Sequence, residues 1–185
     1  MNNSKFALAI FSMCLLIFSG LNAQDMESSG DPFIDLMLGQ VAFTGGRFVQ
    51  LAEAIPADKY GWKASDEVRT TGEQIVHLLS SLYFIPSMMG AERPENITRD
   101  LEKKLTDKEE IIKHLKESME FTTEFLKSYD TANYDEIVKT PFGEFSQRFM
   151  VLLINNHLHE HLGQLIVYAR SNGITPPWSM PQDDM

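Results

Sequence analysis

The residues best suited to chemistry lie in one polar run, Asn155 to Gln164, inside an otherwise apolar segment. Three of the five histidines of the chain are here: His157, His159 and His161. At about 100° per residue in a helix, His157 and His161 lie within roughly 40° of each other, whereas His159 points nearly the opposite way. The flanking apolar residues are Leu152, Leu153, Leu158, Leu165 and Ile166. They predict a largely buried helix whose histidines need partners, and a metal ion is one such partner.

One hypothesis for this run is a zinc protease. The stretch from His157 to His161 reads H-x-x-E-H, an inverted zinc-protease motif in which Glu160 would act as general base. Such a site also needs an acidic ligand well downstream. Only Asp183 and Asp184 follow the predicted helix, and both lie in the terminal tail. The protease hypothesis is therefore disfavoured.

Two further hypotheses are a three-histidine metal site and a metal-free network of hydrogen bonds. In the first, His77 joins His157 and His161, and three neutral imidazoles leave the ion an open position for water or a substrate anion. In the second, the same side chains bond to carboxylates or carbonyls. The apolar surroundings of His77 favour a core histidine over a ligand. The residues by themselves leave both hypotheses open.

These histidines must be positioned by helices, which hydrophobic periodicity predicts over residues 32–55, 72–85, 106–126 and 144–171. Asp31 caps the first helix, and capping boxes that begin at Thr71 and Thr106 open the second and third. Gly173 ends the fourth. The long polar connection from 86 to 104 can border a site, and His114, among charged neighbours, is expected in solvent. No strands are predicted, so the fold class is an all-α bundle.

The first 23 residues match a secretory signal peptide. We therefore expect residues 1–23 as signal, 24–31 as flexible leader, 32–178 as the bundle and 179–185 as a C-terminal tail. The apolar stretch of the signal is shorter than the about 20 residues that span a bilayer, so no stable membrane insertion is expected after cleavage. The only cysteine, Cys14, lies in the signal, so an exported, periplasmic or secreted protein without disulfides is predicted. The formal net charge of −10 argues against nucleic acid as a partner.

Several motifs together resemble the DinB/YfiT-like family. The C-terminal ones are Asn156–Leu165, Tyr168–Arg170, Asn172–Gly173 and Pro176–Pro177, and the upstream ones are Tyr60–Lys63, Thr71–Leu78 and Pro141–Gly143. Their order and spacing extend the resemblance over about residues 32 to 178. The resemblance implies a four-helix bundle of up-down-down-up type, with a divalent metal ion held at the positions of His77, His157 and His161. It also allows a homodimer.

Members of that family include metal-dependent thiol transferases and thiol-dependent isomerases. This chain departs from the family pattern where Glu160 replaces a histidine and Leu162 replaces an arginine, so we expect no basic group near the site. Glu160 and Gln164 are candidates to support the ligands, and His159 is expected to be exposed or hydrogen-bonded elsewhere. The predicted function is a metal-dependent hydrolase or transferase that activates water or a thiol for a small-molecule substrate. A non-catalytic bundle that binds metal or small molecules is the alternative. Zinc or nickel is the expected ion, with iron, copper or manganese as alternatives.

Overall fold

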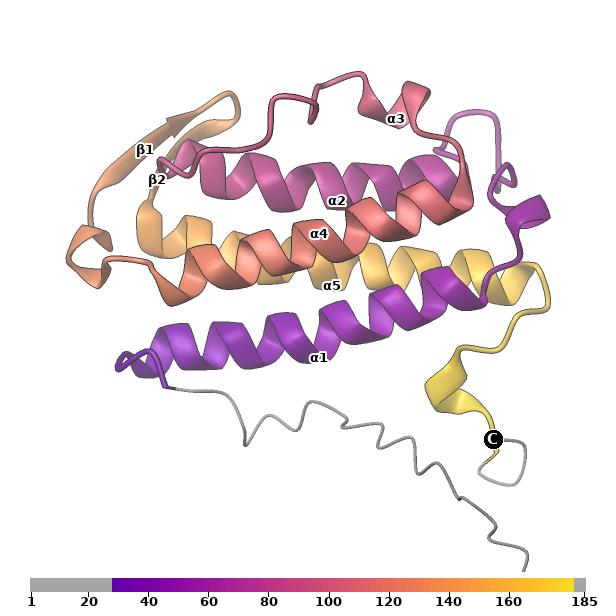
Figure 1. Ribbon diagram of the computed structural model, residues 1–185, viewed down its shortest axis with the longest axis horizontal. Coiled ribbons are helices and arrows are strands. Elements are labelled where there is room, and N and C mark those ends of the chain that lie inside the picture. Colours follow the sequence, from indigo (N-terminus) through magenta and orange to yellow (C-terminus); the bar gives the residue numbers. More distant parts are fainter. Residues whose placement is uncertain (1–27, 182–185) are drawn as a thin grey trace, which may run out of the picture.

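The computed structural model describes residues 28–181, which form a bundle of helices (Figure 1). The helices are α1 (Pro32–Ala54), α2 (Thr71–Met88), the short α3 (Leu101–Lys104), α4 (Lys108–Lys127) and α5 (Gln147–Ser171). Single turns of 3-10 helix occur at Ala57–Lys59, Thr131–Asn133 and Pro177–Ser179. The helices α1 and α5 run in one direction and α2 and α4 in the other, with α3 in the long connection between α2 and α4. The predicted up-down-down-up four-helix bundle is confirmed. The signal peptide, the first half of the leader and the last residues of the tail lie outside the described residues.

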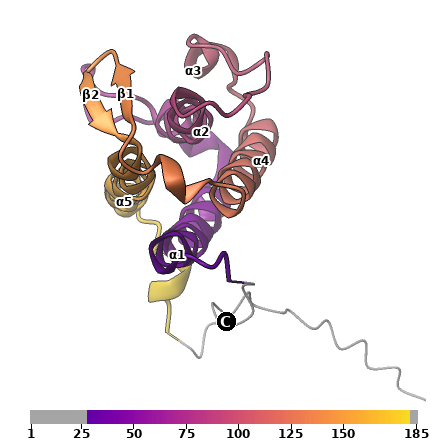
Figure 2. The same ribbon diagram turned by 90° about the vertical axis from the view of Figure 1, so that its left-hand side faces the viewer.

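Each long helix packs against two others, so the bundle is a closed square in cross-section (Figure 2). Helix α2 lies between α4 and α5, and α1 lies between the same two helices on the opposite side. Within residues 28–181, none of the helices is both long and apolar enough to cross a membrane.

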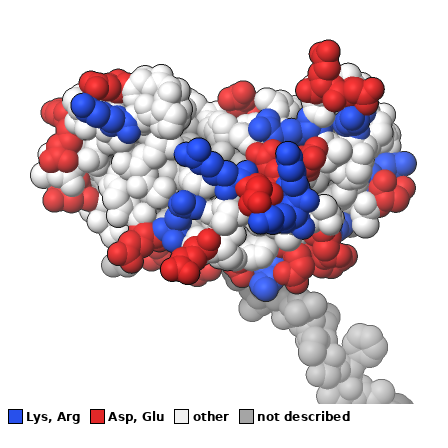
Figure 3. Space-filling model, turned by 90° about the horizontal axis from the view of Figure 1, so that it is seen from above, with Lys and Arg blue, Asp and Glu red and all other residues white. Residues whose placement is uncertain are grey.

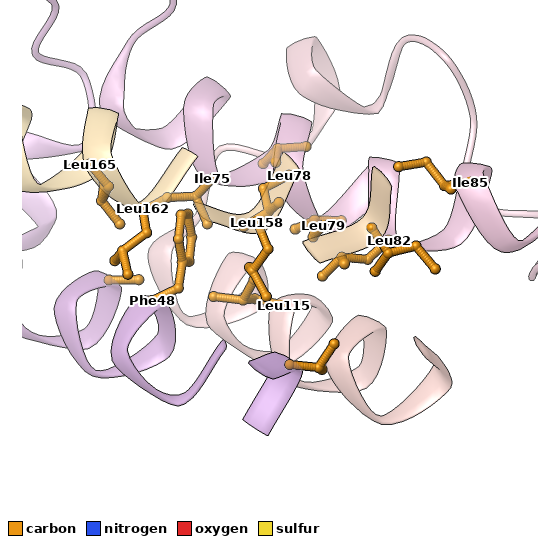
Figure 4. Packing of buried hydrophobic residues seen from close by; sticks show 14 of the residues in the cluster. Phe48, Ile75, Leu78, Leu79, Leu82, Ile85, Leu115, Leu158, Leu162 and Leu165 are labelled. Atoms are coloured by element: carbon orange, nitrogen blue, oxygen red, sulfur yellow. The ribbon is translucent and has the colours of Figure 1, made fainter. Parts of the chain in front are cut away.

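The inner stripes of the four long helices meet in one hydrophobic core (Figure 4). Phe48 of α1, Leu79 of α2, Leu115 of α4 and Leu158 of α5 are each 0% exposed. Burial of one such side chain stabilises the fold by about 1.5–3 kcal/mol. Leu152, which was predicted to be buried, is instead 37% exposed on α5.

The helix N-termini are capped by polar side chains at or next to the predicted positions. The carboxylate of Asp31 accepts hydrogen bonds from the backbone of α1, as predicted. Helix α2 begins with a capping box between Thr70 and Glu73, one residue earlier than predicted. The predicted box fails because its fourth residue, Gln74, turns into the bundle and is 2% exposed. In α4 the cap is Asp107, one residue later than predicted.

Helix α2 also extends three residues past its predicted end and includes Pro86. Proline has no N–H group, so the carbonyl of Leu82 loses its usual partner within the helix. The hydroxyl of Thr122 on α4 donates to that carbonyl at 2.9 Å. A neighbouring helix thus supplies the missing hydrogen bond, which no pattern within the α2 sequence could show.

The prediction that the chain contains no strands was wrong. Strands β1 (Ile137–Thr140) and β2 (Gly143–Ser146) pair as an antiparallel hairpin, and α5 begins at Gln147 rather than at residue 144. Gly143 adopts a φ of +142°, which few other residues tolerate. Each strand has only four residues, too few for an alternating pattern to stand out.

Gly45 and Gly46 do not interrupt α1. A β-carbon at Gly45 would lie 2.8 Å from Sδ of Met119 on α4, whereas one at Gly46 would meet no atom of residues 28–181 within 4 Å. The absence of a side chain at Gly45 therefore permits the close packing of α1 against α4.

Candidate metal centre

Three of the predicted site residues come together where α2 meets α5. His77 projects from α2, and His157 and His161 project from successive turns of α5. One nitrogen from each ring can act as a ligand, and these three atoms lie within 4.8 Å of one another. The ring centre of His161 is 4.9 Å from that of His77 and 4.3 Å from that of His157. His77, which its local sequence favoured as a core histidine, therefore lies in a cluster that could hold a metal ion.

The environment keeps two of these rings neutral. Burial, together with the nearby His77 and Arg69, lowers the pKa of His157 to about 4. Burial likewise lowers the pKa of His161 to about 3, with the neighbouring histidines and Arg69 acting in the same direction. A neutral imidazole has a free lone pair on one nitrogen. The donor set therefore fits a divalent ion that accepts nitrogen ligands, such as zinc or nickel.

His77 has a carboxylate partner that sequence reasoning missed. Its Nδ1 lies 2.8 Å from Oε1 of Glu102, which α3 brings across from 25 residues away. The only signal for this contact was the long polar connection between α2 and α4, which suggested the border of a site but indicated no residue within it. A histidine ligand commonly donates its second nitrogen to a carboxylate in this way.

The expectation that no basic group lies near the site was also wrong. Arg69, in the connection before α2, donates from Nε to Oε2 of Glu102 at 2.7 Å. Burial raises the pKa of Glu102, but the hydrogen bonds from Arg69 and His77 outweigh this effect and hold the pKa below its usual range. A basic group thus reaches the site from a segment far from the clustered α5 histidines in the sequence, and no pattern near them could reveal it.

His161 is hydrogen-bonded through a pair of glutamines. Nδ1 of His161 contacts Nε2 of the buried Gln74, which also donates to Oε1 of Gln164 at 2.7 Å. If the amides of Gln74 and Gln164 are both turned by 180°, the Gln74 oxygen accepts from the Nδ1 proton of His161 and from the Gln164 amide. That arrangement leaves Nε2 of His161 free to bind a metal ion. Gln164, a predicted supporting residue, therefore reaches His161 only through Gln74.

His157 contacts a serine that the sequence did not single out. Its Nε2 lies 3.0 Å from Oγ of Ser81, and this hydroxyl donates to the carbonyl oxygen of His77 at 2.9 Å. Glu160, the other predicted supporting residue, has a 62% exposed side chain, and its Oε2 is 3.8 Å from Nδ1 of His157. This distance exceeds that of a hydrogen bond. Glu160 thus lies at the edge of the cluster, mostly in solvent.

The remaining two described histidines lie away from the cluster. His159 is exposed on the far side of α5, where its Nε2 is 3.0 Å from Oγ1 of Thr44 and 3.1 Å from Oε1 of Gln40. His114 was expected in solvent, but its side chain is only 19% exposed and its Nδ1 lies 3.0 Å from the Glu117 carboxylate.

A cleft of about 810 Å³ opens beside the cluster. Its lining includes Gln74, Glu102 and Gln164, the side chains that support His161 and His77. Charges of both signs line it: Glu67, Arg69, Glu73, Glu102 and Lys103. Basic and acidic side chains likewise mingle over the end of the molecule that carries α3 (Figure 3). The cleft is large enough for a small molecule, and its fixed charges select no single sign of ligand.

Comparisons with solved structures show the same fold in two DinB-like proteins. A DinB-like protein from Bacillus cereus superposes with a TM-score of 0.67 and 17% sequence identity, over 76% of this chain and 93% of that one. A DinB-like protein from Bacillus subtilis superposes with a TM-score of 0.60 and 19% identity, over 76% of this chain and 94% of that one. At this identity the likeness concerns the fold alone. The search of curated proteins found no match.

The sequence itself matches a family model. The model is that of the DinB superfamily, and it covers residues 40–165, most of the bundle and all three clustered histidines. The chain therefore belongs to the DinB superfamily.

Proposed function

We propose that this chain binds one divalent metal ion through His77, His157 and His161 and acts as a hydrolase or transferase on a small molecule. The observation that carries the proposal is the cluster itself, whose three nitrogens lie within 4.8 Å of one another beside an open cleft. Zinc or nickel is the proposed ion, with iron, copper or manganese as alternatives, because the ligands are all imidazole nitrogens.

An ion held by three neutral imidazoles keeps its positive charge and an open position, and so activates water or a thiol for attack on an electrophile. The protein's own groups prepare this site. Glu102 and Gln74 hold the rings of His77 and His161 in place. The cleft lined by Gln74 and Glu102 offers a small molecule a place to bind next to these supporting side chains. A binding cleft beside the cluster supports the enzyme proposal over the alternative, a site that only binds metal.

Elemental analysis of the purified protein without a polyhistidine tag tests the metal site. We expect about one ion per chain in the wild type and in the control His159→Ala, because His159 lies on the other side of α5. We expect no stoichiometric metal in His77→Ala or His161→Ala. A wild-type protein that contains no metal and takes up neither zinc nor nickel would contradict the proposal. An equal loss of bound metal in His77→Ala, His161→Ala and His159→Ala would also contradict it.

Activity assays on the loaded protein then test the enzyme proposal. Activated esters serve as probes for hydrolysis, and a small thiol with an electrophilic acceptor serves for transfer. Removal of the ion by a chelator should abolish turnover, and its return should restore it. A fully loaded protein that is inactive with both probes would favour the binding-only alternative.

We further infer that the protein acts outside the cytoplasm, in the periplasm or the medium. Residues 1–23 match a signal peptide, and the chain after them contains no cysteine. Mass spectrometry of the exported protein should find a first residue near Gln24. An intact first residue Met1 on cytoplasmic protein would contradict this inference.

A further inference from the structure

Glu102 joins three segments that are far apart in the sequence. One of its carboxylate oxygens, Oε1, lies 2.8 Å from Nδ1 of His77, and the other, Oε2, lies 2.7 Å from Nε of Arg69. Each oxygen thus has its own charged or polar partner. The side chains of Glu102 and His77 are 26% and 25% exposed, so both are partly shielded from solvent.

The connection that carries Glu102 is anchored on the bundle. Ile97 is only 1% exposed, and Leu101 and Leu105 on either side of Glu102 pack against the core. Arg93 donates to the carbonyl oxygen of Ile97, and its guanidinium lies 4.3 Å from the ring centre of Phe84 on α2. This packing gives the carboxylate a defined position above α2, where α3 is drawn in Figure 1.

The contact decides which nitrogen of His77 can bind a metal ion. In a neutral imidazole one nitrogen carries the proton and the other carries the free lone pair. A carboxylate accepts hydrogen bonds only, so Nδ1 of His77 must carry the proton toward Glu102. The lone pair is then on Nε2.

We propose that Glu102 is a positioning residue that holds His77 in its Nδ1-protonated form with Nε2 directed to the metal, and that Arg69 holds Glu102 in place. The part that concerns metal binding rests on the proposed function. The competing explanation is that Arg69 and Glu102 only tie two connections together. The two explanations differ in what happens to the His77 ring when Glu102 is changed.

The first measurement needs no metal. Nitrogen NMR of the imidazole rings in the metal-free protein, recorded under alkaline conditions where histidines are neutral, reports which ring nitrogen carries the proton. We expect the Nδ1-protonated form for His77 in the wild type. We expect a shift toward the Nε2-protonated form in Glu102→Ala, because the acceptor is gone. Glu102→Gln retains an oxygen acceptor and should keep the wild-type form.

The second measurement is zinc affinity by competition with a chelator, together with the visible spectrum of the cobalt-substituted protein. Loss of a carboxylate that supports a histidine ligand typically weakens metal binding about 10- to 100-fold. We expect this loss of zinc affinity, and an altered cobalt spectrum, in Glu102→Ala. Glu102→Gln should restore part of the affinity, and Arg69→Gln should lose less of it than Glu102→Ala. Glu95→Ala and Arg99→Gln are matched controls, since both residues are exposed on the same connection. Their affinity should be that of the wild type.

The possible outcomes separate the positioning role from the proposed function. An Nε2-protonated His77 in the wild type, or equal zinc affinity in Glu102→Ala and Glu95→Ala, would overturn the positioning role. Glu102→Ala and Glu102→Gln could also lose zinc affinity equally and lower the melting temperature of the metal-free protein equally. Glu102 would then only tie two connections together, and the positioning role would be overturned. A wild type with the expected proton position but no metal binding would refute the proposed function, and would support the part of the inference that concerns the His77 ring.

Discussion

Helix α5 presents histidines to both of its neighbours, and the two sides use them differently. Toward α2, His157 and His161 meet His77, and each of the three rings has a further polar partner. Toward α1, His159 hydrogen-bonds to Thr44 and Gln40, two uncharged side chains. The same residue type on one helix is a candidate ligand on one side and a surface hydrogen-bonding group on the other. The difference shows that the spacing of histidines along α5 is not sufficient to make a three-histidine site. The facing helix has to supply the third ring.

The largest expected effect on the free energy of unfolding is at Leu158, a core residue of α5. Leu158 lies between the clustered histidines along α5 and is 0% exposed. Leu158→Ala should lower the free energy of unfolding by about 2–5 kcal/mol, because a buried cavity replaces packed methyl groups. Urea denaturation measures this. Leu152→Ala on the same helix, at a position 37% exposed, should cost clearly less. Equal losses would mean that the side chain of Leu158 is not at the core of the bundle.

Metal should stabilise the fold through one side of α5 only. With free ion at 100 times its dissociation constant, the wild type should gain about 2.7 kcal/mol in free energy of unfolding. This gain should vanish in His157→Ala and persist in His159→Ala, because only His157 belongs to the cluster. Urea denaturation with added ion and with a chelator provides the two values. A gain that survives in His157→Ala would place the ion elsewhere.

On the α1 side we expect a smaller change that does not depend on metal. Thr44 is 0% exposed, and its hydroxyl is 3.0 Å from Nε2 of His159. His159→Ala should therefore lower the free energy of unfolding of the metal-free protein by about 1 kcal/mol, the usual worth of one hydrogen bond. A double-mutant cycle with Thr44→Val isolates that bond. Strictly additive effects would show that the two side chains do not interact.

The smallest effect on the free energy of unfolding is expected at Gln40, the second side chain that contacts His159. Gln40 accepts at 3.1 Å from His159, but this contact is exposed to solvent, where water can replace it. Gln40→Ala should change the free energy of unfolding by less than about 0.5 kcal/mol. A loss as large as that of His159→Ala would mean that Gln40, rather than Thr44, anchors the ring.

Local patterns predicted the helices well and their ends less well. Asp31 caps α1 as predicted, because a cap depends on residues adjacent in the chain. The end of α2 was missed because the hydroxyl of Thr122, on another helix, satisfies the carbonyl of Leu82. The hairpin was missed because its strands of four residues are too short for a clear alternation.

The same division applies to the site. The pairing of His157 with His161 follows from helix geometry, since four residues make about one turn. The partners of the rings come from elsewhere. Ser81 and Gln74 lie on α2 among residues that read as ordinary helix, and Glu102 and Arg69 lie in connections with no periodicity at all.

The sequence by itself determined four amphipathic helices, the i, i+4 histidine pair on one face of the last helix, and the motifs shared with the DinB superfamily. These features are local or repeat along the chain, so residue order is enough to reveal them. The family resemblance already grouped His77 with this pair, but only the tertiary structure brings the three rings together and shows Glu102 and Arg69 next to His77. Those contacts join residues 25 or more positions apart. They form because the core packs α2 against α5 and anchors the connection that carries α3.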